Sequence, residues 1–283
     1  MKRLRKGNRT SSGQDGFTLV ELLIALALLS LILTAVVSLN IGTSRAAALL
    51  QARNDLLPES QIAQNYMASK LRQATYVFPN GSAFTLNGTS TTTRDPSGSA
   101  LWTVGSDPVV AFIVPPRMVS TGQCLAATAA ANTANQDTYC YAFYSFYGTM
   151  RNNITSSAGL ENPGADAAND STSWVLMEYR SYYAAGNAGG YTTPAVAVAA
   201  IPTGGVGHLL MDYLKPTTET GTDVLFNCPA ATGNVMQVAG TTNVTMNLAA
   251  YRSVAGQPLN LPSTGRYALT VYPRNLGATQ TSN

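Results

Sequence analysis

Charged side chains are scarce in this chain of 283 residues. Lys, Arg, Asp and Glu together make up 11% of it, whereas ordinary soluble domains carry about 25%. Its surface must therefore be built mainly from neutral polar residues, which is typical of a protein outside the cell. Because 45% of the residues are hydrophobic, the chain can bury a full-sized core, and intrinsic disorder is excluded.

Positive charge is also missing from most of the chain, although the formal net charge is +3. Five basic residues and one acidic residue, Asp15, lie within residues 1–16, and the remainder carries 12 basic against 13 acidic residues. Such a balance produces no general positive field. A nucleic-acid partner therefore has no support from charge, and the basic N-terminus is interpreted as a targeting signal.

Recognisable catalytic machinery is absent from the sequence. The chain has one histidine, His208, which begins a strand-like run and has no Gly-x-Ser-x-Gly nucleophile motif to serve. There is no P-loop, His-rich metal motif or Cys-x-x-Cys pair. We therefore expect a structural role for His208, no catalytic residues, no cofactor and no enzymatic activity. The competing hypothesis, a tethered extracellular enzyme, requires a deep pocket with convergent polar groups.

A long apolar run lies near the N-terminus. Residues 17–39 contain a single charged residue, Glu21, and as a helix they would span about 35 Å, enough to cross a membrane. A secretory signal peptide would have a shorter apolar stretch and a small-residue cleavage site, which Leu39-Asn40-Ile41 does not offer. The preceding basic residues predict a cytoplasmic N-terminus and an outward-facing C-terminal bulk.

The residues around Glu21 form a specific motif. Gly16-Phe17-Thr18-Leu19-Val20-Glu21 resembles the processing site of type IV prepilins. The resemblance implies that prepilin peptidase removes residues 1–16 by cleaving between Gly16 and Phe17, and that Phe17 is N-methylated. It also implies that Glu21 pairs with the N-terminal amine of a neighbouring pilin, since an unpaired charge in apolar surroundings is costly. The alternative is a simple membrane anchor with Glu21 near the interface.

Helical periodicity continues beyond the apolar run. The apolar positions Leu49, Leu56, Ala63, Met67, Leu71 and Ala74 form one stripe, which predicts an amphipathic helix and hence a single helical segment over residues 17–78. Pro58 lies inside this segment and removes a backbone donor. We expect a kink there rather than a helix end, because the stripe resumes in register. A plain break between anchor and head is the alternative.

The remaining residues, 79–283, predict a β-rich head of single-domain size. Gly, Pro and Asn clusters separate apolar or alternating runs, a pattern typical of antiparallel strands. The expected strands are 109–114, 139–147, 173–183, 195–201, 208–214, 223–226, 243–249 and 267–272. Residues 126–135 and 155–172 are expected to be surface loops. The predicted fold class is α+β, with a long N-terminal helix and an antiparallel β-sheet head, as in pilins.

Three cysteines would lie in an oxidising compartment, where pairing is expected. A Cys124–Cys140 disulfide is favoured because it would close the loop over residues 125–139 and stabilise the fold by about 3 kcal/mol. The alternatives are three buried free thiols or a partner role for Cys228.

Two further features suggest binding. Glu161, Asp166 and Asp170, with Asn162 and Asn169, offer oxygen ligands for calcium, but the signal is weak, because they lack EF-hand spacing and acidic residues in a solvated loop usually have no such role. The run 139–147 is rich in Tyr and Phe. One of its faces must be core, and the other could pack against another subunit or, with a basic groove, stack on nucleic acid.

Two short segments resemble a narrower group of pilins. Leu71-Arg72-Gln73-Ala74 and the C-terminal Arg274-Asn275 are similar to the helix end and C-terminal ending of PilW/PulJ-type minor pilins and pseudopilins. The resemblance implies a subunit of a type IV pilus, type II secretion or competence filament. It would be held in the inner membrane before assembly and would then contact other pilins through its N-terminal helix. The bulk of the head favours low copy number in a tip or priming complex. A DNA-uptake or adhesive pilin is the alternative.

Overall fold

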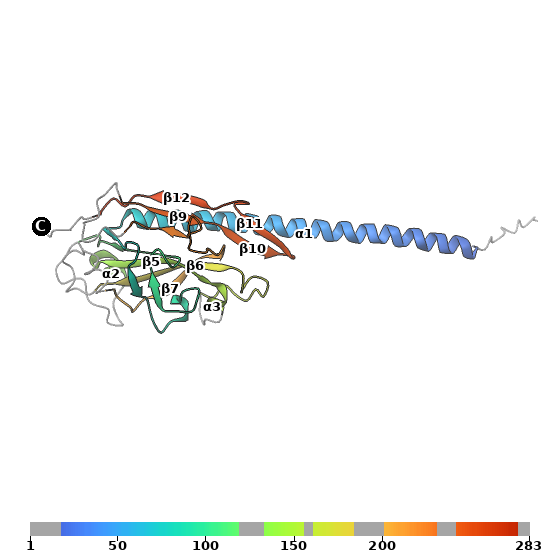
Figure 1. Ribbon diagram of the computed structural model, residues 1–283. Helices are drawn as coiled ribbons and strands as arrows, with labels where there is room; N and C mark the ends of the chain where they lie inside the picture. The colour runs from blue at the N-terminus through green and yellow to red at the C-terminus, as the bar shows by residue number, and fades with distance from the viewer. Residues whose placement is uncertain (1–17, 119–132, 156–160, 184–200, 231–241, 277–283) are drawn as a thin grey trace, which may run out of the picture. The chain divides into compact units, whose positions relative to one another are not determined.

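The computed structural model describes residues 18–118, 133–155, 161–183, 201–230 and 242–276 (Figure 1). The chain divides into two units, Met1–Ala48 and Leu49–Asn283. A long, initially apolar N-terminal helix is followed by antiparallel β-sheets. The predicted α+β class is therefore confirmed.

Helix α1 runs without interruption from Leu19 to Arg72 and crosses the boundary between the two units. In the first unit, residues 19–47 are all exposed. In the second unit, one face of the helix is buried, and most of its buried residues lie three or four positions apart, as in an amphipathic helix. These residues are Ala52, Leu56, Ser60, Ala63, Met67, Ala68 and Leu71.

The helix ends six residues earlier than the predicted residue 78. Residues Tyr76–Val77 instead form strand β1, which pairs with Val109–Val114, strand β4. The amide of Thr75 already donates to the carbonyl of Ile113 at 2.8 Å. Sequence periodicity missed this change because the apolar stripe continues into residues that are buried in the sheet rather than in the helix.

Among the described residues, the largest sheet has seven strands in the order β1-β4-β5-β6-β7-β10-β11, and all neighbours are antiparallel. Its further strands are β5 (Ala142–Met150), β6 (Trp174–Tyr182), β7 (Val206–Leu214), β10 (Ala250–Val254) and β11 (Gln257–Leu261). Strand β4 coincides with its predicted range. Strand β5 starts later than predicted because Thr133–Tyr139 form a short helix, α2.

Two smaller sheets complete the described part of the head. One has the order β12-β9-β8 and consists of Tyr267–Val271, Val244–Leu248 and Phe226–Asn227. The other pairs β2 (Ala83–Thr85) with β3 (Leu101–Thr103). A 3-10 turn, η1 (Thr91–Thr93), and a short helix, α3 (Arg151–Thr155), lie between strands. Except for Ile201, the predicted strand 195–201 falls outside the described residues.

The aromatic strand β5 is covered on both faces, so its predicted partner-binding face is not available. On one face, the ring of Phe146 lies 6.2 Å from that of Tyr66 on α1. On the other, the ring of Tyr147 lies 4.8 Å from that of Trp102 on β3, and Phe143 packs against Phe84 of β2. The aromatic run therefore forms the centre of the core.

A close backbone approach at Gly207 generates a test of this packing. A Cβ atom there would lie 2.4 Å from the Tyr147 hydroxyl and 2.9 Å from the Thr92 carbonyl oxygen. The tyrosine hydroxyl donates to the same carbonyl at 2.8 Å. We expect Gly207→Ala to destabilise the fold by about 1–3 kcal/mol, because overpacking must shift this contact. Thermal unfolding of the purified protein measures the loss.

The matched control is Gly204→Ala, three residues earlier. No atom lies within 4 Å of a Cβ built there, so its effect should stay within about 0.5 kcal/mol. Equal unfolding temperatures for the two variants would contradict the packing described for β5, β7 and η1.

Candidate functional site

Thr18 and Glu21 join at the start of α1. The Thr18 amide and hydroxyl both donate to Glu21 Oε2 at 2.9 Å, and the Glu21 amide donates to the Thr18 hydroxyl at 3.3 Å. This reciprocal arrangement is a capping box, which satisfies backbone donors that a helix N-terminus otherwise leaves free. Within one subunit, the carboxylate of Glu21 is therefore held beside the first turn. Gly16 and Phe17 lie outside the described residues.

The helix beyond Glu21 is suited to an apolar environment. It contains an 18-residue window with mean hydropathy 2.8, none of which is buried, and is long and apolar enough to cross a membrane. Large exposed side chains follow one another along it, including Leu22, Leu26, Ile32 and Val36. Apolar surface on this scale marks a contact with lipid or protein.

Pro58 lies inside α1 rather than at its end. The buried stripe continues on both sides of it, from Leu56 to Ser60 and Ala63. The break between anchor and head, which was the alternative, is therefore not observed at this residue. The kink stays a prediction.

The cysteines are only partly within the described residues. Cys124 lies outside them, so its disulfide with Cys140 stays a prediction. Cys228 is buried and free, and its burial raises the pKa of the thiol to about 12. A thiol with so high a pKa is largely protonated and therefore unreactive at neutral pH.

The residues proposed as calcium ligands are bound to protein groups instead. Glu161 contacts the ring of His208 at 2.8 Å and accepts a hydrogen bond from the amide of Leu209. Asp170 forms an ion pair with Arg151. Within the described ranges, no group of three or more His, Cys, Asp or Glu side chains is arranged to hold a metal ion. The calcium hypothesis is therefore not supported, because an arginine and backbone amides occupy these carboxylates.

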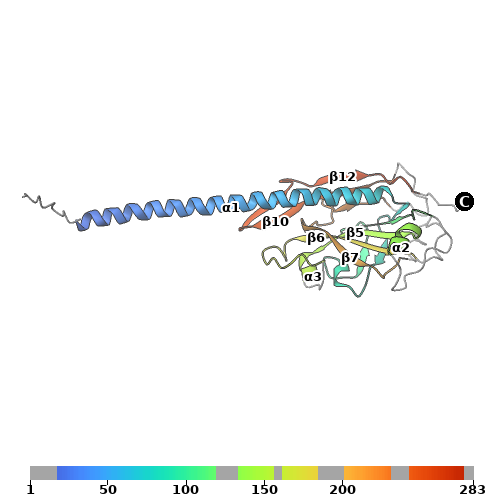
Figure 2. The same ribbon diagram turned by 180° about the vertical axis from the view of Figure 1, so that it is seen from behind.

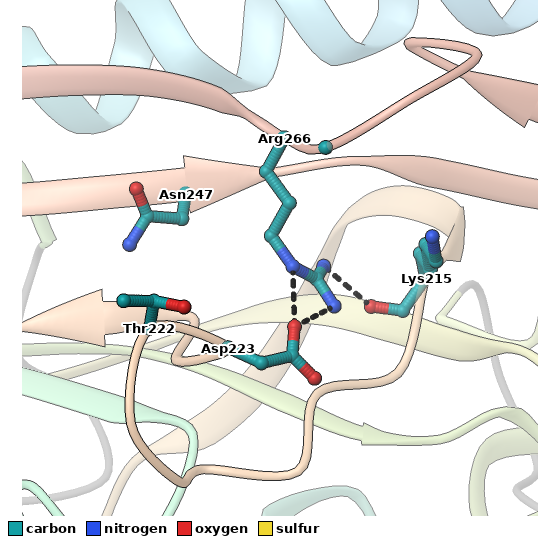
Figure 3. A pocket seen from close by; sticks show the side chains of 6 residues that line it. Lys215, Thr222, Asp223, Asn247 and Arg266 are labelled. Atoms are coloured by element: carbon teal, nitrogen blue, oxygen red, sulfur yellow. Dashed lines mark hydrogen bonds and ion pairs between the residues drawn. The ribbon is translucent and has the colours of Figure 1, made fainter.

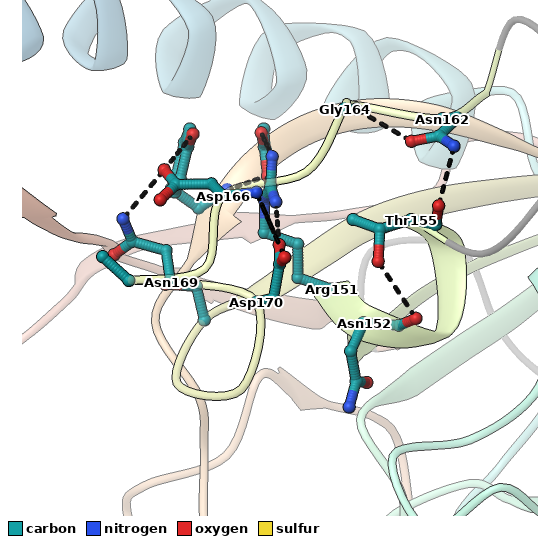
Figure 4. A network of polar contacts seen from close by, with 12 residues as sticks. Arg151, Asn152, Thr155, Asn162, Gly164, Asp166, Asn169 and Asp170 are labelled. Carbon is teal, nitrogen blue, oxygen red and sulfur yellow. Dashed lines mark hydrogen bonds and ion pairs between the residues drawn. The ribbon is translucent and has the colours of Figure 1, made fainter.

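Arg151 is the centre of a buried polar cluster that the sequence reading did not identify (Figure 4). Its side chain is 1% exposed. It donates to both carboxylate oxygens of Asp212, at 2.9 and 3.0 Å, and also binds Asp170. Its guanidinium lies 4.9 Å from the ring centre of Tyr213, whose hydroxyl donates to Asp166 at 2.9 Å. These bonds to two aspartates raise the pKa of Arg151 although burial alone would lower it.

The same cluster connects the loop over residues 161–172 to strand β10. The Asn169 side chain donates to the carbonyl of Ser253 and accepts from its amide, at 3.1 and 2.6 Å. The Ser173 hydroxyl donates to the Tyr251 carbonyl. Side chains therefore take the place of a neighbouring strand along this edge of β10, where the sheet itself provides a single paired residue, Ala250 with Leu214.

Helix α1 joins the cluster through Glu59. Its carboxylate accepts a hydrogen bond from the Asp212 amide at 2.7 Å. Burial raises the pKa of the Glu59 carboxyl, and the hydrogen bond from Asp212 acts in the opposite direction. The helix is therefore attached to β7 by a polar contact as well as by its apolar stripe.

A pocket of about 310 Å³ lies beside the turn that precedes β12 (Figure 3). Lys215, Thr222, Asp223, Asn247, Gly265 and Arg266 line it. Arg266 is bound to Asp223 at 2.8 Å and donates to the carbonyls of Lys215 and Pro216. The guanidinium of Arg266 therefore links the turn before β12 to residues 215–216 and 223. His208 is not among the residues that line this pocket.

One comparison with known proteins gives a match. The family described as the prokaryotic N-terminal methylation motif matches residues 11–37. The search of curated proteins and the search of solved structures find no match. The matched segment contains Gly16, Phe17 and Glu21, so the chain carries the N-terminal motif of a type IV pilin-like prepilin. This motif implies processing by prepilin peptidase, membrane anchoring and assembly with other pilins.

The buried cluster generates a stability prediction. Arg151→Met should cost about 3–5 kcal/mol, because it leaves two aspartates without the charge that neutralises them. Denaturant unfolding measures this loss. Arg53→Met, at an exposed position of α1, is the control and should change stability by less than about 0.5 kcal/mol. Similar midpoints for both variants would show that the cluster contributes little.

Glu59 generates a prediction with a defined pH dependence. An acid whose pKa is raised by folding favours the folded state below its unfolded pKa, and this contribution is lost as pH rises through the folded pKa. Glu59→Gln keeps an oxygen to accept from the Asp212 amide but removes the charge. We expect it to raise the thermal midpoint at pH 7, with the gain disappearing towards about pH 4. A gain that grows on acidification would contradict this account of Glu59.

Proposed function

We propose that this chain is a minor pilin or pseudopilin, a structural subunit that enters a type IV pilus, type II secretion or competence filament and catalyses no reaction. The observation that supports it best is the apolar, unburied start of α1, in which Glu21 is the one charged residue of the run 17–39. This segment coincides with the matched methylation motif. A carboxylate in that position needs a cationic partner once lipid or protein surrounds it.

The mature N-terminal amine of a neighbouring subunit is the partner we propose for Glu21. In the isolated subunit, Thr18 satisfies the carboxylate by hydrogen bonds but leaves its charge unneutralised. An amine on Phe17 of the next subunit would supply that charge and set the axial register of the helices. Cleavage after Gly16 and methylation of Phe17 belong to the same proposal.

A tip or priming position within the PilW/PulJ group is the finer form of the proposal. It rests on the short Leu71-Arg72-Gln73-Ala74 and Arg274-Asn275 resemblances and on the size of the head. The alternative of DNA uptake gains no support from the aromatic strand, because both faces of β5 are buried. The alternative of a tethered enzyme gains none from the pocket beside β12, because Arg266 is engaged in binding its own chain.

Glu21→Ala tests the assembly mechanism. Membrane insertion and cleavage should persist, because the change makes the span more apolar. The amount that enters sheared filaments or co-purifies with partner pilins should fall about tenfold or more, since an unpaired buried amine costs several kcal/mol and each 1.4 kcal/mol corresponds to about a factor of ten. Intact-mass spectrometry should show a start at methylated Phe17 for both proteins.

The matched control is Thr18→Val, which removes the capping hydroxyl but keeps the carboxylate. Loss of a cap costs only about 1 kcal/mol, so assembly should fall much less than in Glu21→Ala. Equal incorporation of Glu21→Ala and wild type would require the pairing mechanism to be abandoned.

A further inference from the structure

Strand β12 forms the outer edge of the three-stranded sheet. It pairs with β9 through all five of its residues, and no described strand pairs with its other side. In both views of the molecule, β12 lies at the margin of the second unit, with no described strand beyond it (Figures 1 and 2).

The direction of the unpaired backbone groups follows from strand alternation. The amide of Asn247 on β9 donates to the Leu225 carbonyl, on the β8 side. Its neighbour Met246, which is paired with Leu269, must then point its backbone groups toward β12. Leu269, which is paired with Met246, therefore points its backbone groups toward β9. Its neighbours Ala268 and Thr270 point their N–H and C=O groups away from β9.

The outer side of β12 is also accessible. Ala268, Thr270 and the following Tyr272 are all exposed, and Tyr272 stands at the next position of the same alternation, just after the strand ends at Val271. Pro273 comes next and has no amide to donate. The edge therefore offers backbone groups at alternate residues over one short, defined length.

The other described sheet edges are short or protected. Strands β1 and β8 have two residues each, and β2 and β3 have three. Strand β11 is as long as β12, but it contains Pro258, opposite Ser253. The backbone groups of Ser253 bond Asn169 and so point away from β11. The backbone of Pro258, opposite Ser253, therefore points to the outer edge of β11, where a proline blocks the addition of a further strand. Strand β12 has no proline and no charged residue.

We propose that the outer edge of β12 receives an extended segment of another filament subunit, which adds a strand to the sheet. Backbone donors and acceptors at alternate residues match those of an extended polypeptide, which can pair with them in the manner of a further strand. Natural proteins cover or blunt such edges, and β12 is not blunted. The inference rests on the proposed function only in taking the partner from the same filament.

The charges beside this edge define the partner further. Arg72 at the end of α1 and Arg274 just after β12 are joined by a backbone hydrogen bond, from the Arg274 amide to the Arg72 carbonyl. Both side chains are exposed, and neither takes part in the ion pairs formed by the described residues. The incoming segment therefore carries a carboxylate at the end that meets these two arginines.

The same charges argue against a second copy of β12 as the occupant. Residues 266–276 contain no acidic residue, so a second copy of this edge would bring no carboxylate to Arg72 and Arg274. The partner strand therefore comes from a different sequence.

Thr270→Pro tests the backbone part of the proposal. It removes an outward amide and places a ring on the edge without removing a bond to β9. We expect recovery with partner pilins to fall about tenfold. Thr270→Val is the matched control, because both variants lose the Thr270–Thr245 hydroxyl contact while valine keeps the amide. It should remain within about twofold of wild type. Equal recovery of the two variants overturns the proposal.

Hydrogen exchange of the wild-type protein gives a second readout that does not depend on the folding of a variant. The mature full chain is compared in detergent micelles and in sheared filaments. The amides of Ala268, Thr270 and Tyr272 should exchange quickly in micelles and at least about tenfold more slowly in filaments. Fast exchange in both states, or protection already in monomeric micelles, overturns the proposal.

Further measurements distinguish an acidic partner from a second copy of this chain, and the failure of strand addition from the failure of the proposed function. A double Arg72→Glu, Arg274→Glu variant should also lower recovery, and unchanged recovery would refute the acidic partner. Protection that appears in micelles only as protein concentration rises, with dimers in light scattering, would replace the proposed partner with a second copy. Fast exchange in filaments that contain the protein refutes strand addition alone, whereas absence of the protein from filaments refutes the proposed function.

Discussion

The burial of one face of α1 against the sheets is the contact on which the second unit depends. Leu56, Met67 and Leu71 project from the helix into the same core as Phe112 and Phe146 of the seven-stranded sheet. Because most of the buried residues of α1 lie three or four positions apart, the helix can bury them only along one line. The outward face remains free for water or for other subunits.

The sequence of the single helix α1 therefore suits two different environments along its length. Residues 22–39 carry no charge and are predominantly apolar on all sides, and residues 19–47 are all exposed, while the segment from Ala52 to Leu71 is apolar on one side only. A helix that is apolar all round needs lipid or protein about its whole circumference. The loss of the all-round apolar pattern after Leu39 thus marks the end of the part of the helix that only a membrane or a filament can surround.

Polar contacts complement this packing where the chain leaves regular structure. Asn169 and Ser173 bond the edge of β10, and Arg151 is buried between Asp170 and Asp212. Tyr213, at φ 53°, has its ring in contact with two guanidinium groups, 4.9 Å from that of Arg151 and 4.4 Å from that of Arg252. Such a buried network requires every member to be satisfied, which explains how a loop without regular secondary structure is held in one arrangement.

Local pattern in the sequence was sufficient for the apolar span, the motif around Glu21, the stripe from Leu56 to Leu71 and most of the longer strands, because each is a repeat or spacing within a few residues. The short strands β1, β2, β3, β10 and β11 were not predicted, since pairing with distant strands rather than local periodicity stabilises them. Tertiary structure alone decided that both faces of β5 are buried and that Arg151 binds Asp170. Among the described strands, it also left the outer edge of β12 unpaired, because which side of a strand is paired depends on the order of strands in the sheet.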